Sequence, residues 1–263
     1  MNDARTDLAP GPPLLLGPDD VSPVIVANLG GASACLLLGD HAGRAVPAAL
    51  AGLGLPAGAM DGHIAWDIGI AGLGEWLSAT LDAVFIRQAY SRLVIDCNRR
   101  PGDLAAAPAV SDGVIVPGNV DLNAAALAAR RAEIWQPYQD RIAGELDARA
   151  AGGRQSLLVS LHSFTPVMQG EERPWRFGVL HRGDSALSLR VLVLLRAAVG
   201  VAAGDNQPYA MDEVDNTIPL HADARGLDYL ELEVRQDLIA DAAGQAAVGQ
   251  FLAEVLAEAI GGA

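Results

Sequence analysis

Short apolar runs separated by segments of helical periodicity are the feature of this chain that most constrains its fold. The apolar runs are of strand length and predict strands at residues 24–27, 34–38, 84–86, 93–95, 157–161, 177–180 and 229–234. Helical periodicity predicts helices at residues 69–83, 121–151, 185–198 and 244–260. An Asp at the start of the second helix is the expected N-cap. Strands that alternate with helices are typical of a sheet covered on both faces, so we expect an α/β protein.

The chain of 263 residues is long enough to bury a full hydrophobic core. No internal repeat or low-complexity linker divides it. We therefore expect one domain over residues 21–263, preceded by a flexible lead-in over residues 1–20.

Charge and composition exclude several classes of partner. The formal net charge of −14 argues against nucleic acids and anionic membranes, because both need a positive surface. The longest apolar stretch, residues 191–203, contains Arg196 and is too short to span a bilayer. The N-terminus is polar and lacks the apolar core of a signal peptide. Cys35 and Cys97 lie in apolar runs and read as reduced core thiols, so we expect a cytoplasmic protein.

Two of the predicted strands deliver a histidine at their carboxyl ends. The run before His162 and the run before His41 both end where an open α/β sheet binds ligands. A catalytic zinc needs about three protein ligands of the His and carboxylate type, and Asp67 and Asp40 compete for the third position. Neighbouring strand residues point to opposite faces, which disfavours Asp40 beside His41 and favours Asp67. On pattern alone, a metal site and two hydrogen-bonded structural histidines are about equally favoured.

Two carboxylates alternate along a late strand. Glu231 and Glu233 are two residues apart and therefore share a face. A carboxylate on a buried strand is costly unless it has a partner or a function, such as that of a general base. An edge strand with its acidic face in solvent explains the same pattern equally well.

Three arginines surround the apolar run at residues 93–95. Arg92, Arg99 and Arg100 could form a clamp for an anionic substrate, because guanidinium groups bind carboxylates bidentately. Ion pairs with surface carboxylates are the alternative, and the pattern alone favours them.

Taken together, these segments resemble the N-formylglutamate amidohydrolase family. The matching motifs span most of residues 24–240 and follow one another in the family's order: Gly39-Asp-His-Ala-Gly-Arg-Ala-Val-Pro47, His63-Ile-Ala-Trp-Asp-Ile-Gly69, Ser91-Arg-Leu-Val-Ile-Asp-Cys-Asn-Arg99, Leu161-His-Ser-Phe-Thr-Pro166, Asn206-Gln-Pro-Tyr209 and Leu232-Glu-Val-Arg-Gln-Asp-Leu238. The resemblance implies a three-layer α/β/α fold with a mixed central sheet, of the phosphorylase/hydrolase-like kind related to zinc carboxypeptidases.

The resemblance also implies an activity. The family hydrolyses N-formyl-L-glutamate to formate and glutamate in histidine degradation, by attack of a zinc-bound water. By that resemblance His41, Asp67 and His162 would bind Zn²⁺, and Glu233 would be the general base. Arg44 stands where carboxypeptidases carry their second ligand; since it cannot bind a metal, we expect it to stabilise the oxyanion.

The expected partner is a small acidic N-acyl amino acid. The adjacent Asn98 and Arg99 look like the pair with which carboxypeptidases hold a substrate carboxylate. The full set of expected substrate-binding residues is Arg92, Asn98, Arg99, Asn206, Tyr209, His221 and Arg235. A carboxypeptidase-like zinc peptidase and a non-catalytic ligand-binding protein on the same scaffold are the alternative functions.

Overall fold

The computed structural model describes residues 14–261 except residues 101 and 212. Residues 1–13 of the predicted lead-in lie outside the described residues. Within the described part of the chain, no helix combines the length and the apolar character needed to cross a membrane.

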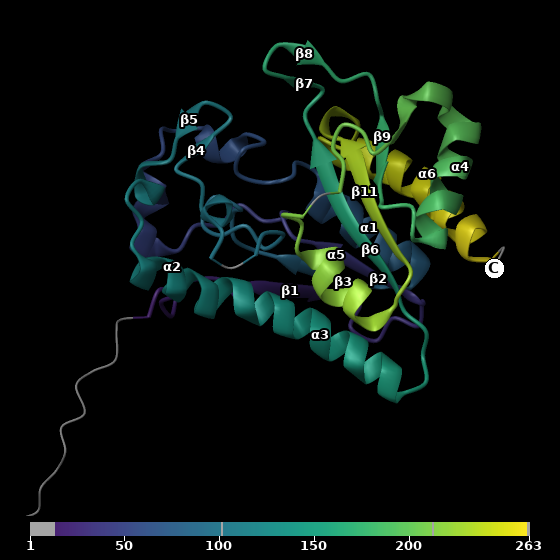
Figure 1. The fold of residues 1–263 in the computed structure, drawn as a ribbon, viewed down its shortest axis with the longest axis horizontal. Helices are drawn as coiled ribbons and strands as arrows, with labels where there is room; N and C mark the ends of the chain where they lie inside the picture. Colours follow the sequence, from purple (N-terminus) through teal and green to yellow (C-terminus); the bar gives the residue numbers. More distant parts are fainter. Residues whose placement is uncertain (1–13, 101, 212, 262–263) are drawn as a thin grey trace, which may run out of the picture.

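A mixed sheet of seven strands forms the centre of the molecule (Figure 1). Its order is β1-β3-β2-β6-β11-β9-β10. The four strands β3, β2, β6 and β11 run parallel, β1 and β9 are antiparallel to their inner neighbours, and β10 is parallel to β9. The bounds of these strands are β1 Val24–Ala27, β2 Cys35–Gly39, β3 Val84–Gln88, β6 Leu157–Phe164, β9 Phe177–Leu180, β10 Ala203–Asp205 and β11 Tyr229–Arg235. Two small hairpins stand apart from the sheet, β4 (Val110–Ser111) with β5 (Val114–Ile115), and β7 (Val167–Met168) with β8 (Glu171–Glu172).

Helices cover both faces of the sheet, which confirms the predicted three-layer α/β/α fold. The helices of one layer are α1 (Ile70–Leu81), α4 (Ala186–Val199) and α6 (Ala242–Gly261), and those of the other are α2 (Ala124–Arg130), α3 (Gln136–Ala151) and α5 (Thr217–His221). Strand β2 shows why the strands are apolar throughout: Leu36 and Leu38 pack into the core under α3, while Leu37 packs into the core under α1 and α6.

The predicted strand at residues 93–95 is wrong. These residues lie outside the sheet, in a turn region that follows β3, and both edges of β3 are already paired, with β1 and β2. Side chains replace the missing strand partners: Asn119 Nδ2 donates to the carbonyl of Leu93, and Arg130 Nη1 donates to the carbonyl of Val94. Leu93, Val94 and Arg130 are all buried, with Arg130 1 % exposed. These side-chain hydrogen bonds therefore satisfy backbone carbonyl groups that water cannot reach.

The predicted helix at residues 121–151 is interrupted. A π-helical turn, Arg131–Trp135, separates α2 from α3. Pro137 follows this turn and has no backbone N–H to donate, so regular α-helical bonding cannot continue through it. The expected Asp121 cap is also wrong, because Asn123 Oδ1 accepts the N–H of Ala126 at 2.9 Å.

We predict that Gly69→Ala destabilises the protein more than Gly58→Ala. Both glycines have left-handed backbone angles, with φ of 87° and 84°, so both alanines carry backbone strain on the order of 1–3 kcal/mol. A Cβ at Gly69 would also lie 2.2 Å from the carbonyl oxygen of Ile239, whereas a Cβ at Gly58 meets no atom within 4 Å. Urea unfolding followed by circular dichroism measures both losses; equal losses would contradict the expected clash.

Candidate functional site

Three buried side chains from separate segments meet at the carboxyl edge of the parallel strands. His41 follows β2, Asp67 precedes α1, and His162 lies on β6. Their ligand atoms lie within 4.8 Å of one another, and each residue is at most 4 % exposed. The N–H of Asp67 donates to the carbonyl of His41 at 2.8 Å, which joins two of the segments through their backbones.

Both histidines direct the same ring nitrogen toward Asp67. The Nδ1 atoms of His41 and His162 lie 3.5 and 3.0 Å from Asp67 Oδ2. The Nε2 atoms face away, with His41 Nε2 2.7 Å from Asp96 Oδ1. His162 Nε2 lies 3.1 Å from the Ser160 hydroxyl and 3.6 Å from Asp40 Oδ2.

This donor set fits a metal ion. His41 Nδ1 is buried and has no hydrogen-bond partner within the described part of the chain. Buried polar atoms normally have a partner, so this nitrogen is a candidate metal ligand. Two imidazole nitrogens and one carboxylate are ligands that suit zinc. Asp40 lies behind His162 rather than inside the group, so the geometry favours Asp67 over Asp40 as the third ligand. Metal binding by these residues stays a prediction.

The charges of the cluster are coupled. Burial alone would raise the pKa of Asp67, but His41 and His162 hold it well below its usual range. Burial alone would lower the pKa of His162, but Asp40 and Asp67 raise it well above its usual range. Protons on the imidazoles thus balance the carboxylates, and a bound cation would displace them.

A cavity of about 600 Å³ lies beside the cluster. Two further carboxyl groups, those of Glu231 and Glu233, line this cavity. Strand pairing puts Glu233 of β11 opposite His162 of β6, and Glu231 opposite Ser160. Neither Glu231 Oε2 nor Glu233 Oε2 has a hydrogen-bond partner among the described residues. Burial raises the pKa of Glu231 to about 7 and that of Glu233 to about 8. The alternative of a solvent-facing edge strand is wrong, because β11 is central and both side chains are buried.

Two arginines of the predicted clamp, Arg92 and Arg99, already have partners. Arg92 Nη1 lies 3.4 Å from Asp67 Oδ1, and its Nη2 lies 3.0 Å from Asp96 Oδ2. Arg92 thus binds carboxylates of the site itself. Arg99 Nη1 donates to Asp215 Oδ1 at 3.1 Å and to the carbonyl of Asn98 at 3.0 Å.

Asn98 supports a neighbouring helix. Its Oδ1 accepts the backbone N–H groups of Asn216 and Thr217, at the start of α5. Asn98 also lines the cavity, so both a structural role and a substrate contact are compatible with its place.

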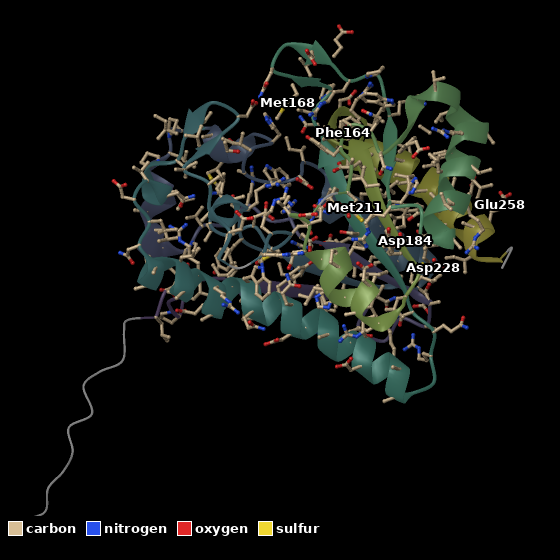
Figure 2. The ribbon with its side chains drawn as sticks, in the orientation of Figure 1. Phe164, Met168, Asp184, Met211, Asp228 and Glu258 are labelled. Atoms are coloured by element: carbon tan, nitrogen blue, oxygen red, sulfur yellow. The ribbon has the colours of Figure 1, made fainter. Side chains whose placement is uncertain are left out.

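Part of the apolar cavity wall comes from the end of β6 and the β7–β8 hairpin. Figure 2 labels Phe164 and Met168, which lie at this end of the molecule and line the cavity. Tyr209 lines it as well; its hydroxyl accepts a hydrogen bond from Arg173 Nη1 at 2.8 Å.

Besides Asp40, four predicted site residues do not line the cavity. Arg44 is about half exposed and pairs with Asp61, so its predicted oxyanion role has no support from its place. Asn206 Oδ1 accepts the backbone N–H of His181, and Arg235 pairs with Asp237 at 2.8 Å.

The fourth of these residues is His221. It is buried 2.7 Å from Gln139 Oε1, and burial lowers its pKa to about 4. The two side chains form part of the support beneath the site rather than of the cavity wall.

Sequence reasoning missed other residues of the cavity. Asp96, Asp215 and the ion pair of His63 with Asp112 all line it. Asp96 had a usable signal, because it ends the apolar run that the sequence analysis singled out. Asp215 had none, since it reaches the site from a distant loop.

Comparisons with known proteins identify a family and similar folds. A family model described as N-formylglutamate amidohydrolase matches residues 33–240. A crystal structure of a gene product from Agrobacterium tumefaciens is similar, with 35 % identity, a TM-score of 0.90, and coverage of 94 % of this chain and 98 % of that one. An N-formylglutamate amidohydrolase from Ralstonia eutropha JMP134 shares the fold, with 19 % identity, a TM-score of 0.66, and coverage of 91 % and 98 %. No curated protein sequence gives a significant match.

We predict that zinc affinity shows which of Asp67 and Asp40 is the third metal ligand. Replacing His41 or His162 by Ala, or Asp67 by Asn, removes a ligand and should abolish stoichiometric zinc binding. Asp40→Asn removes a group behind His162 and should weaken binding by only about 10–100-fold. Chelator competition measures the affinities. Loss of zinc in Asp40→Asn with full retention in Asp67→Asn would reverse the assignment.

We predict that, in the metal-free protein, the free energy of unfolding of Glu233→Gln increases relative to that of wild type as the pH rises. The folded-state pKa of Glu233 is about 8 and its ordinary value is 4.5, so its contribution to stability is full below pH 4.5. That contribution is lost as the pH rises from 4.5 to 8, because over this range the carboxyl ionises in the unfolded chain while it stays protonated in the folded protein. Gln at this position cannot ionise.

Urea unfolding of chelated protein from pH 5 to 8.5 should therefore show a variant advantage that grows with pH. Glu172→Gln, on the exposed strand β8, is the matched control. An advantage of Glu233→Gln that stays constant over this range, or matches that of the control, would contradict the buried-carboxyl explanation.

Proposed function

Because the chain belongs to the N-formylglutamate amidohydrolase family, we propose that it is a zinc-dependent amidohydrolase that releases formate from N-formyl-L-glutamate or a related N-acyl amino acid. The observation that carries the proposal is the group His41, Asp67 and His162 facing an unpartnered Glu233 across one cavity. A hydrolase needs this combination of ligands and a base near the same point in space.

Zinc would be held by His41 Nδ1, His162 Nδ1 and Asp67 Oδ2. When bound, zinc supplies a Lewis acid that acidifies water and polarises an amide carbonyl. Asp40, the rival from the sequence, instead lies beside the outer nitrogen of His162.

Glu233 is the proposed general base. It lies beside His162 in the strand register, and its Oε2 atom is available to accept a proton from water. Burial raises its pKa to about 8 in the metal-free protein, and a cation bound nearby would lower that pKa, so that the ionised carboxylate could act as the base. It then donates the proton to the leaving amide nitrogen.

Arg99 is the proposed contact for the α-carboxylate of the substrate. Among the described residues, both of its hydrogen bonds use Nη1, which leaves Nη2 and Nε for a ligand. Binding energy at this carboxylate would hold the acyl carbon in place without acting on the reacting bond. Tyr209 is a further contact at the cavity wall.

We also propose that the protein works in the cytoplasm, in histidine degradation. The buried free thiols of Cys35 and Cys97 suit a reducing compartment. The pathway is what the family resemblance implies for an enzyme that acts on N-formylglutamate.

The test is formate release by zinc-loaded protein. Wild type should release formate from N-formyl-L-glutamate or another N-formyl amino acid. Glu233→Gln should keep its zinc and its substrate affinity yet lose about 10²–10⁴-fold in kcat, because the general base is gone. Elemental analysis and calorimetry check zinc and binding. Near-normal kcat in Glu233→Gln would remove the base from the mechanism, and wild type without formate release would refute the activity.

A further inference from the structure

Glu231 lies deeper in the cavity than the proposed base. It precedes Glu233 by two positions on β11, so it points to the same face, about 7 Å further from the carboxyl edge of the sheet. Ser160 of β6 and Leu180 of β9 flank it on the neighbouring strands. It lines the cavity, yet it is only 3 % exposed.

Among the described residues, Glu231 has no hydrogen-bond or ion-pair partner. Its Oε2 atom is buried without a hydrogen bond, and across the described residues no hydrogen bond or ion pair involves this side chain. Burying a carboxyl group without a hydrogen-bond partner destabilises the folded protein by about 1–3 kcal/mol or more. A hydrogen-bond donor on a bound ligand would offset this loss. An unpartnered buried acceptor aimed into the cavity is therefore a recognition point.

The charges of the cavity decide what kind of ligand group Glu231 meets. Arg92 is bound to Asp67 and Asp96, so it is engaged by the site itself. Arg99 has room for one carboxylate, which the α-carboxylate of an amino acid uses. A second carboxylate that reached the deep end of the cavity would lie beside Glu231.

We propose that Glu231 is a specificity-determining residue that accepts a hydrogen bond from the side chain of the amino-acid half of the substrate. The preferred substrates are N-acyl amino acids whose side chain ends in a neutral hydrogen-bond donor, such as the amide of glutamine, rather than in a second carboxylate. This inference rests on the proposed function, because it assumes that the acyl carbon lies near His162 and Glu233.

The two kinds of substrate side chain differ in how they interact with Glu231. A side-chain amide of suitable length can hydrogen-bond to Glu231 in either of its charge states, whereas a carboxylate at the same place meets like-charge repulsion whenever Glu231 is ionised. Sites built around a buried polar group discriminate strongly against ligands that cannot pair with it. We therefore expect at least a tenfold preference for the amide.

The experiment compares N-formyl-L-glutamine with N-formyl-L-glutamate on zinc-loaded protein. Wild type should show a kcat/KM at least roughly tenfold higher for the glutamine substrate. Glu231→Gln should reduce that ratio at least tenfold, mainly by improving the glutamate substrate, because its new amide can donate to a carboxylate. Glu172→Gln is the matched control: it makes the same substitution on the exposed strand β8, outside the cavity, and should leave the ratio unchanged.

Dissociation constants of both compounds, measured by calorimetry, give a second readout that does not need turnover. A wild-type preference for the glutamate compound, or a ratio that Glu231→Gln leaves unchanged, overturns the role of Glu231. Absence of formate release from every N-formyl amino acid refutes the proposed function instead, and the ratio of dissociation constants then still decides the specificity. Circular dichroism confirms that each variant is folded.

Discussion

The pairing register of β6 and β11 is the constraint on which the site depends. Glu233 is opposite His162, and Leu232 is opposite Leu161. The leucines pack into the core under α4 and α6, which sends the alternate residues to the cavity. A slip by one residue would turn Glu231 and Glu233 into that apolar core, so hydrophobic burial itself fixes which side chains reach the site.

This register concentrates acidic groups in a buried place, and the resulting charge has to be balanced. Asp40, Asp67 and Asp96 are each at most 4 % exposed, and they surround two imidazoles and one guanidinium. Each of the three carboxylates contacts at least one of these nitrogen groups. Isolated buried carboxylates would be costly, whereas this arrangement pairs them and leaves one imidazole nitrogen, Nδ1 of His41, directed at the centre.

The sequence predicted the layers and the histidine pair well, because both follow from local patterns. Apolar runs in strands such as β2 and β6 need no partner to be recognised, and a histidine at the carboxyl end of a parallel strand has a known destination. The same reasoning gave a wrong strand prediction at residues 93–95. It is as apolar as a strand, but whether a strand can form depends on a free sheet edge, which no local pattern encodes. Its hydrogen bonds come instead from Asn119 and Arg130, which are distant in sequence.

The arginines show why the substrate remained harder to predict than the reaction type. A guanidinium group in a sequence indicates a carboxylate partner but not whether that partner belongs to the protein. Arg44 and Arg92 both contact carboxylates of the chain, and Arg99 has a bonded Nη1 and two further nitrogens that face no partner among the described residues. The number of cationic groups left for a ligand is therefore smaller than the sequence suggested. Since reaction type depends on the metal and the base, while substrate choice depends on this remaining charge balance, two proteins can share the family's fold and chemistry and still select different amino acids.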